Sequence, residues 1–394
     1  MSANPNSYLK AVGLWRLPLS LGVQIVLGFF MAHGYDYRVS YIAGRNIAQG
    51  TSPYLGGVVE GFLSSWYGRD VQGIGETPLW ALYTGVSYIL SGGDIHIFNL
   101  ILKIPIIGCN FLLSYLAVKR GCDPRFFLLN PFALLVTASW GKPDNISTYF
   151  SIVPLLLSSG LVATSLLFTV SLMVKPLGLP IFPALVGKYS SQSRVRAIMM
   201  ATMTIALSTA FFFLPFMVFR WPFQTVLEGA ANWLKPAGGI SPYNIIEAVY
   251  GTTTLPENLA TLGYAPFVAL AILTILILIH PPKHPQDTLS IAITSTALFL
   301  SLRPWVSEQN LYIILALMVF TLGKLPTRLL WIIPTIFAVA NLSIIQNLYL
   351  ILAPTSVETP DIYPPVRLWV KFLISIGWLA LIWWTIASKR LYRW

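Results

Sequence analysis

Long apolar runs separated by short polar turns extend along this sequence from beginning to end. Several runs reach the roughly 18 to 20 apolar residues that a helix needs to cross the hydrocarbon core of a membrane. The predicted crossing segments are 14–32, 95–118, 126–139, 198–219, 267–279, 289–302, 311–322, 329–352 and 368–387, with three short apolar pieces within 146–187. The pattern predicts an all-α polytopic membrane protein with roughly 11 to 13 transmembrane helices.

Two stretches, 34–78 and 220–261, are long and polar enough to be external loops. In the first, apolar residues recur at three- and four-residue spacing, at Val39, Ile42, Ala43 and Ile47. This spacing is typical of an amphipathic helix that lies in the plane of the membrane interface. The Gly and Pro residues in 50–53 should end that helix.

The run 78–90 is apolar but short for a crossing helix. If it crossed fully, the basic cluster of Lys119, Arg120 and Arg125 after the next run would lie outside the cell or in the lumen. Basic residues beside membrane helices favour the cytoplasm. We therefore interpret 78–90 as a half-inserted helix, which keeps that cluster in the cytoplasm.

Composition supports a membrane class. Of 394 residues, 56% are hydrophobic and 10% are charged, whereas soluble domains carry about 25% charged residues. No polar stretch is long enough for a separate soluble domain, so residues 1–394 are predicted to form one integral-membrane domain.

The formal net charge of +11 comes from Lys and Arg scattered at helix ends. A nucleic-acid partner would need them on one patch, so that partner is excluded. The positive-inside rule places both termini in the cytoplasm of a multi-pass protein. The host membrane would be the plasma membrane in a prokaryote and the endoplasmic reticulum in a eukaryote. Nearly all the acids then fall on the opposite side, including Asp36, Glu60, Asp70, Glu76, Asp144 and Glu308.

Asp36 is the first candidate for chemistry. It follows the first apolar run and is flanked by Tyr35 and Tyr37 at the membrane edge, where a lone charge is costly unless it is used. A solvated loop acid without a function is the simpler alternative. A carboxylate in this place could take the proton from an acceptor hydroxyl as a general base.

Several motifs, in this order, resemble the GT-C superfamily of integral-membrane glycosyltransferases. They are GYDYRVSYIAGRNIAQGTSPY, LNPFALL with WGKPDN, MVKPLGLP and RPWVSEQN. The similarity is greatest to the polyprenyl-phosphate-mannose-dependent mannosyltransferases, of the glycosylphosphatidylinositol mannosyltransferase type and the family 87 type. It implies a GT-C-like fold with Asp36, in the first external loop, as the catalytic base. The second acid that the family often carries at this point is absent here, so no paired-acid motif supports a divalent metal. A divalent metal stays open as a cofactor, and no cofactor is certain.

Asp144 and Lys142 lie together in WGKPDN. Asp144 could cap the following helix, contact the sugar or phosphate, or do both. Lys142 could meet the donor phosphate or extend to the lipid headgroups. Lys175 stands within apolar sequence, so we expect either an ion pair with the lipid phosphate or a short interfacial loop.

RPWVSEQN concentrates polar residues at the outer end of two predicted spans. Arg303 has the planar fork that suits a phosphate, although it could instead pair with Glu308. Glu308 and Gln309 could bind sugar hydroxyls, and Asn310 and Glu76 complete the predicted substrate-binding set. His33 ends the first span and could orient Asp36, but an ordinary interface histidine is the simpler interpretation. No His or Cys cluster has metal-ligand spacing.

These residues predict an inverting glycosyltransferase. It would move a hexose, with mannose as first choice, from a polyprenyl- or dolichyl-phosphate donor to a lipid-linked or glycan acceptor on the non-cytoplasmic face, among membrane lipids. A secondary transporter or lipid flippase is the alternative, although the paired halves of many transporters are not evident. A non-catalytic membrane subunit would explain the hydrophobicity but not the polar motifs on one side.

Overall fold

The structure, a computed structural model of the chain, describes residues 12–13, 15–58, 72–157, 159–226, 234–284, 287–340 and 365–391. Glu60, Asp70 and the second half of the predicted 329–352 span lie outside these ranges. Most of the described residues are helical, and strand is confined to two short segments. The fold is therefore all-α, as predicted.

Most predicted apolar runs correspond to helices. The α-helices are α2 (Arg16–Phe30), α3 (Gly34–Ala48), α4 (Pro78–Ser91), α5 (Ile95–Lys119), α6 (Arg125–Leu129), α7 (Pro131–Leu134), α8 (Asp144–Leu156), α9 (Leu161–Val174), α10 (Phe182–Ser190), α11 (Arg194–Phe219), α13 (Asn244–Tyr250), α14 (Ala265–Ile279), α15 (Asp287–Leu302), α16 (Leu311–Leu322), α17 (Leu329–Ala340) and α19 (Pro365–Ser388). Tighter or wider turns form η2 (Leu135–Ser139), η3 (Pro176–Ile181), η4 (Glu257–Tyr264) and η5 (Glu308–Asn310). Two short strands, β1 (Gly238–Gly239) and β2 (Trp305–Val306), pair in parallel.

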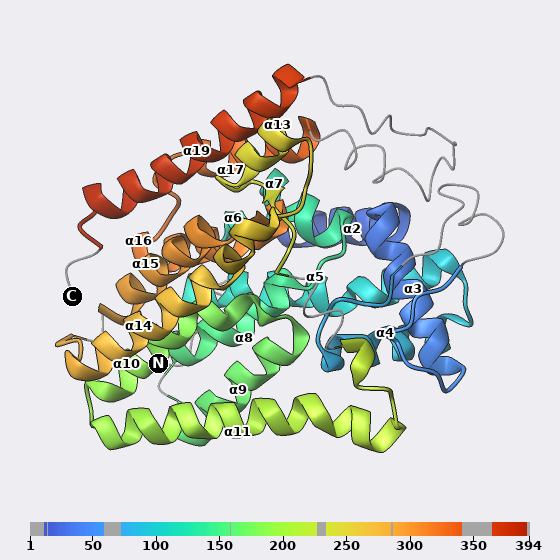
Figure 1. Cartoon of the computed structure of the whole chain (residues 1–394), viewed down its shortest axis with the longest axis horizontal. Coiled ribbons are helices and arrows are strands. Elements are labelled where there is room, and N and C mark those ends of the chain that lie inside the picture. The colour runs from blue at the N-terminus through green and yellow to red at the C-terminus, as the bar shows by residue number, and fades with distance from the viewer. Residues whose placement is uncertain are drawn as a thin grey trace.

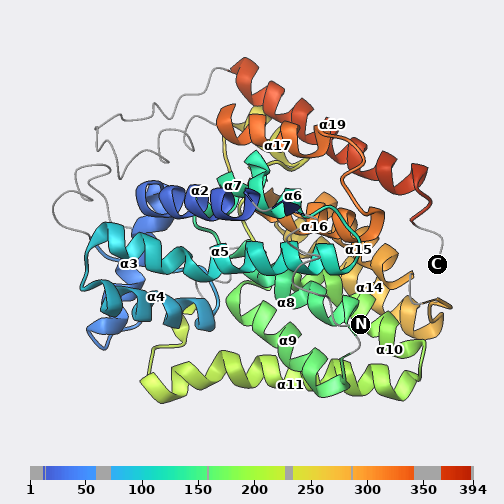
Figure 2. The same ribbon diagram turned by 180° about the vertical axis from the view of Figure 1, so that it is seen from behind.

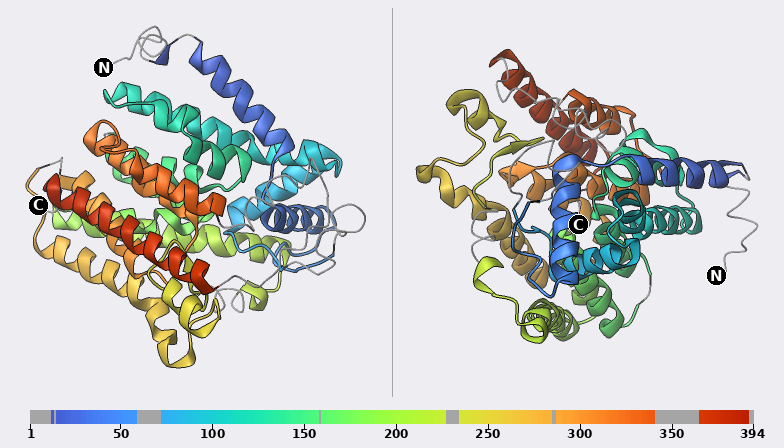
Figure 3. Two further views of the ribbon diagram at one scale, coloured as in Figure 1. Left: turned by 90° about the horizontal axis from the view of Figure 1, so that it is seen from above. Right: turned by 90° about the vertical axis from the view of Figure 1, so that its right-hand side faces the viewer.

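The core forms around α16, which is apolar on every side. All residues from Leu311 to Phe320 are buried, as expected for a helix without a polar face. Figures 1 and 2 show α11 and α19 along opposite sides of the bundle, with α5 and α8 between them. From above, α2 begins at the end of the molecule where α19 finishes (Figure 3).

Helix α3 does not lie alone in the membrane interface. Its apolar face is buried against the protein, with Ile42 and Ala43 almost fully covered. It packs so closely on α4 that a Cβ added to Gly44 would come within 2.5 Å of the Thr84 carbonyl oxygen. The helical pattern and its end after Ala48 are as predicted, but the partner of the apolar face is α4 and not lipid.

Four described helices are long and apolar enough to cross a membrane, namely Ile95–Lys119, Arg194–Phe219, Glu257–Ile279 and Val366–Ser388. Five shorter apolar helices accompany them, namely Arg16–Phe30, Leu161–Val174, Asp287–Leu302, Glu308–Leu322 and Leu329–Ala338. These helices support the assignment as a membrane protein. The roughly 11 to 13 crossings expected from the sequence stay a prediction. The 126–139 run is not one helix, because a break at Asn130 divides it and its last turns widen into η2.

The predicted orientation can be tested by labelling single cysteines in a background without Cys109 and Cys122, both of which are buried. Thr51→Cys and Thr253→Cys, at exposed positions of the two predicted external loops, should react with an impermeant maleimide from outside sealed cells. Cysteines at exposed Lys119 and Lys324 should react only after permeabilisation. Labelling of Lys119→Cys from outside intact cells would contradict the predicted orientation.

Candidate functional site

Asp36 lies in the first turn of α3 and not in an extended loop. His33 is the N-cap residue, and its Nδ1 accepts a hydrogen bond from the Asp36 backbone N–H at 3.4 Å. The carboxylate faces the positive end of the helix dipole, which favours its charged form. His33 Nδ1 also lies 3.1 Å from Asp36 Oδ2. His33 therefore orients Asp36, which the sequence offered only as the second interpretation of this histidine.

Trp140 is a further partner of Asp36 that the sequence did not single out. Its Nε1–H donates to Asp36 Oδ2 at 2.7 Å, and its ring stacks on His33 with centroids 4.7 Å apart. The indole comes from the WGKPDN turn, which lies more than a hundred positions further along the chain. Two rigid rings thus hold the orientation of one carboxylate.

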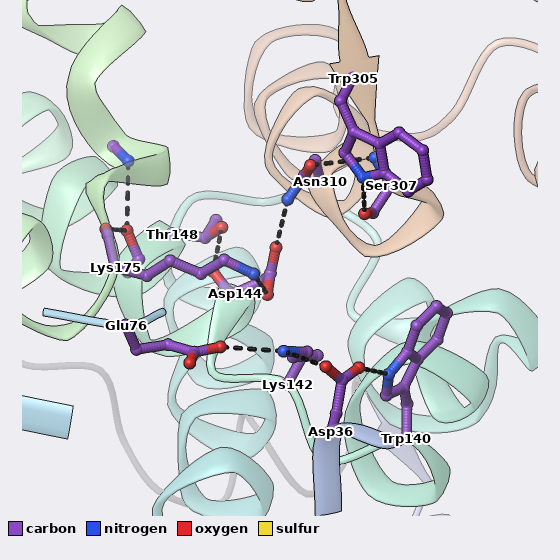
Figure 4. A network of polar contacts seen from close by, with 12 residues as sticks. Asp36, Glu76, Trp140, Lys142, Asp144, Thr148, Lys175, Trp305, Ser307 and Asn310 are labelled. Carbon is purple, nitrogen blue, oxygen red and sulfur yellow. Dashed lines mark hydrogen bonds and ion pairs between the residues drawn. The ribbon is translucent and has the colours of Figure 1, made fainter. Parts of the chain in front are cut away.

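Lys142 stands between two carboxylates (Figure 4). Its Nζ is 2.9 Å from Asp36 Oδ1 and 2.8 Å from Glu76 Oε1. The side chains of Lys142 and Glu76 are only 13% and 11% exposed. The predicted substrate residues Glu76 and Lys142 are therefore brought to Asp36, and Lys142 neutralises acids instead of extending to the headgroups.

The charges in this cluster are strongly coupled. Burial acts to raise the pKa of the Asp36 carboxyl, but Lys142 and His33 outweigh it and hold that pKa well below its usual range. Burial acts to lower the pKa of Lys142, and the charges of Asp36 and Glu76 raise it above its usual value. The stabilisation that Asp36 and Lys142 give each other is lost as pH falls from the ordinary carboxyl pKa through the lowered pKa of Asp36. It is also lost as pH rises from the ordinary lysine pKa through the raised pKa of Lys142.

Asp144 forms a second ionic cluster next to the first. Its Oδ2 is 2.6 Å from Lys175 Nζ, and its Oδ1 accepts a hydrogen bond from Asn310 Nδ2 at 3.0 Å (Figure 4). The prediction that Asp144 caps α8 is wrong, because Asp144 is the first helical residue and the cap position is Pro143, which makes no side-chain bond. The buried carboxylate takes two tertiary partners instead.

Lys175 is fixed by the same cluster. Its backbone is extended between α9 and η3, and its carbonyl oxygen accepts a hydrogen bond from Ser147 Oγ at 2.8 Å. The side chain is 16% exposed. The resting partner of Lys175 is therefore Asp144, which holds this cation beside the first cluster.

The polar residues of the RPWVSEQN turn differ in their contacts. Burial lowers the pKa of the Arg303 guanidinium and the charge of Asp144 opposes this, so the two groups act on each other. Arg303 also lies over the Phe299 ring, with its Cζ 5.8 Å from the centroid. Glu308 and Gln309 are buried, and Gln309 Oε1 has no hydrogen-bond partner among the described residues. Pairing of β2 with β1 ties this turn to the 220–261 loop.

A polar stripe on α5, which was not predicted from the sequence, lies beside the site. Asn99, Lys103, Asn110 and Ser114 are fully buried or nearly so, and their spacing places them on one helical face. Asn110 Oδ1 accepts hydrogen bonds from Asn145 Nδ2 at 2.8 Å and from the Tyr312 hydroxyl at 2.9 Å. Polar residues at a helical period within an apolar run were the available signal.

Lys103 is the charged member of that stripe. Its Nζ donates to the carbonyl oxygens of Met31 and Ser139. Met31 lies two residues before His33, and Ser139 lies directly before Trp140. It also lines, with Asp36, Glu76 and Lys142, a cavity of about 10 Å³, space for roughly one water molecule. Side chains must therefore move before anything larger than a water molecule can enter this cavity.

Metal ligands are not grouped here. Within the described ranges, no set of three or more His, Cys, Asp and Glu side chains is placed to hold a metal ion. The space between Asp36 and Glu76 is taken by the ammonium group of Lys142.

Comparisons with known proteins assign no family to this chain, because no family model, curated protein or solved structure matches it.

Proposed function

We propose that this chain is an inverting glycosyltransferase that transfers a hexose, with mannose as first choice, from a polyprenyl- or dolichyl-phosphate donor to a lipid-linked or glycan acceptor. The observation that carries the proposal is the cluster of Asp36, Lys142 and Glu76. A carboxylate able to accept a proton stands 2.9 Å from a cation able to meet a phosphate. Both lie at the end of an apolar helical bundle, where a lipid-linked substrate could reach them.

The proposed reaction is a single displacement at the anomeric carbon. The acceptor hydroxyl attacks C1 of the sugar, its proton passes to Asp36, and the C1–O bond to phosphate breaks with its electron pair leaving on the phosphate. Configuration at C1 inverts because the nucleophile and the leaving group occupy opposite faces. Arg303, Lys142 and Lys175 are the proposed cations for the phosphate.

Lys142 must loosen its hold on Asp36 for the base to work. A carboxylate whose pKa is held well below its usual range is a weak proton acceptor, since general-base efficiency rises with basicity. A donor phosphate brings a new negative charge that competes for Lys142. Movement of the Lys142 ammonium group toward the phosphate would raise the basicity of Asp36 when the donor is bound. Without donor, Lys142 would stay on Asp36 and keep it a weak base.

Buried ion pairs also occur in transporters, so a secondary transporter or lipid flippase is the second candidate, favoured by the Asp144–Lys175 pair. Purified protein, radiolabelled polyprenyl-phosphate sugars and a lipid extract, with products resolved by chromatography, test the two. A labelled glycolipid supports glycosyl transfer. Movement of label across proteoliposomes without a new product supports transport and contradicts the enzyme.

Arg303 variants should affect use of the donor more than use of the acceptor. Arg303→Ala is expected to raise the apparent donor KM by roughly 10- to 100-fold, since a hydrogen bond to a charged group contributes about 1.5–3 kcal/mol. Arg303→Lys keeps the charge but loses the fork, so its effect should be smaller. Donor and acceptor KM are measured by varying each substrate separately.

A purely structural Arg303 predicts a different result. Arg303→Ala and Glu308→Gln would then both lower the melting temperature, and the donor KM would not change selectively. Unchanged donor kinetics in Arg303→Ala would remove this residue from the proposed phosphate site.

A further inference from the structure

A cationic cavity lies at the end of the molecule away from Asp36. It has a volume of about 470 Å³ and is lined by Arg16, Asp123, Arg125, Lys324 and Arg328 among other residues. Arg16 begins α2, and Asp36 follows the other end of that helix. Since α2 has 15 residues, about 22 Å of helix lies between the two ends. This cavity is therefore separate from the proposed transfer site.

The cavity carries a surplus of positive charge. Its one acid, Asp123, is already paired with Arg125, with Arg125 Nη2 2.6 Å from Asp123 Oδ2. In the part of the chain that the structure describes, no carboxylate forms an ion pair with Lys324 or Arg328, and both side chains are exposed. An anion entering here would therefore meet cations that have no competing acid.

Apolar surface adjoins these cations. The cavity is also lined by the apolar side chains of Phe126, Leu129, Val319, Leu325 and Trp331, together with Asn130, Pro131 and Thr327. On the same first turns of α2, a groove of about 680 Å³ runs between α2 and α5, with the apolar lining Leu17, Pro18, Leu21, Gly108, Phe111, Leu112 and Tyr115. A cationic recess beside an apolar groove matches a molecule with an anionic head and hydrocarbon chains.

We propose that this cavity binds the phosphate headgroup of an anionic diacyl phospholipid. The charge pattern places this end of the molecule in the cytoplasm, where anionic lipids attract juxtamembrane Lys and Arg and basic recesses between helices take lipid headgroups. The phosphate would lie among Arg16, Lys324 and Arg328, and the acyl chains would follow the apolar surface. Volume also fits, because ligand sites commonly enclose about 300–1,000 Å³.

Native mass spectrometry of the detergent-solubilised full chain tests the proposal with two lipids of identical acyl chains, phosphatidylglycerol and phosphatidylcholine. Phosphatidylglycerol should bind at least about tenfold more tightly. Lys324→Gln/Arg328→Gln should weaken its binding by roughly 30-fold, since each cation near the lipid contributes about a factor of five. Lys324→Arg/Arg328→Lys keeps the charge and should keep the binding.

The matched control is Lys389→Gln/Arg390→Gln, which removes the same charge from two exposed positions outside the cavity. It should bind phosphatidylglycerol as the unaltered chain does. Equal affinity for the two lipids, or an equal loss in the control, would overturn the site. Displacement of the lipid by glycerol phosphate at equal concentration would overturn the lipid assignment in favour of a soluble phosphate.

Discussion

Asp36→Asn is expected to lower the rate of sugar transfer by about 10²–10⁴-fold, the usual contribution of a general base. The amide keeps the shape of the side chain and can still accept the hydrogen bond from Trp140 Nε1. It cannot take the proton of the acceptor hydroxyl. Single-turnover measurement of labelled product, with donor at saturation, reports this loss directly in the chemical step.

Glu247→Gln is the matched control for Asp36→Asn. Glu247 is also a largely buried carboxylate paired with a lysine, with Lys371 Nζ 2.6 Å from its Oε2, but it lies on α13, outside the proposed site. The same change of acid to amide there should leave the rate of transfer unchanged. Near-normal turnover in Asp36→Asn would remove this residue as the base.

Lys142→Met is expected to have the second large effect, because Asp36 and Glu76 would lose the cation that separates their charges. Removing one partner from a buried ion pair costs about 3–5 kcal/mol, and the partial exposure of this cluster favours the lower end. The melting temperature should fall, and transfer should fall further because the donor phosphate loses a cation. Adding Glu76→Gln should recover much of the stability but not the activity.

The pH dependence of Lys142→Met separates its electrostatic role from a packing role. Burial raises the pKa of Asp36 and Lys142 is the main group that lowers it. Without Lys142 the carboxylate should protonate at higher pH, so the acidic limb of kcat/KM should move toward neutral pH. The limb is followed with the labelled-donor assay across a buffer series.

Lys371→Met is the control for this charge effect, since Lys371 and Lys142 are both 13% exposed and each has a carboxylate partner. Lys371→Met should lower the melting temperature without moving the acidic limb. If Lys142→Met destabilises the protein but leaves the pH profile in place, then Lys142 is structural and does not tune Asp36.

Local sequence predicted the helices well where a single run of residues decides the outcome. The run from Leu311 to Phe320 is apolar at every position, so it could only be buried or membrane-embedded. All ten of these residues are buried in α16. The spacing of Val39, Ile42 and Ala43 likewise determined a helix with one apolar face. What covers that face could not be predicted, because lipid and a neighbouring helix both satisfy the same pattern.

The candidate site depended more on tertiary contacts. Charge type and position were enough to select Asp36 and Lys175, since a charge beside apolar sequence needs a partner. Asp144 and Lys142 were selected from the WGKPDN motif, and Glu76 was named only as a member of the predicted substrate-binding set. The sequence did not contain the choice of partner. Lys142 pairs with Glu76, 66 positions away, and Asn310 donates to Asp144 across 166 positions. The same rule that selected Lys175 could have selected Lys103, which also lies within an apolar run.

The sequence by itself determined an apolar all-α chain, the positions of most of its helices and the charged residues that must find partners. Only the tertiary structure decided that Lys142 lies between two carboxylates, that His33 and Trp140 orient Asp36, and that Asp144 is not a helix cap. The physical reason is range. Helix periodicity and apolar length act between near neighbours in the chain, whereas an ion pair depends on atoms within about 4 Å that packing brings together from distant segments.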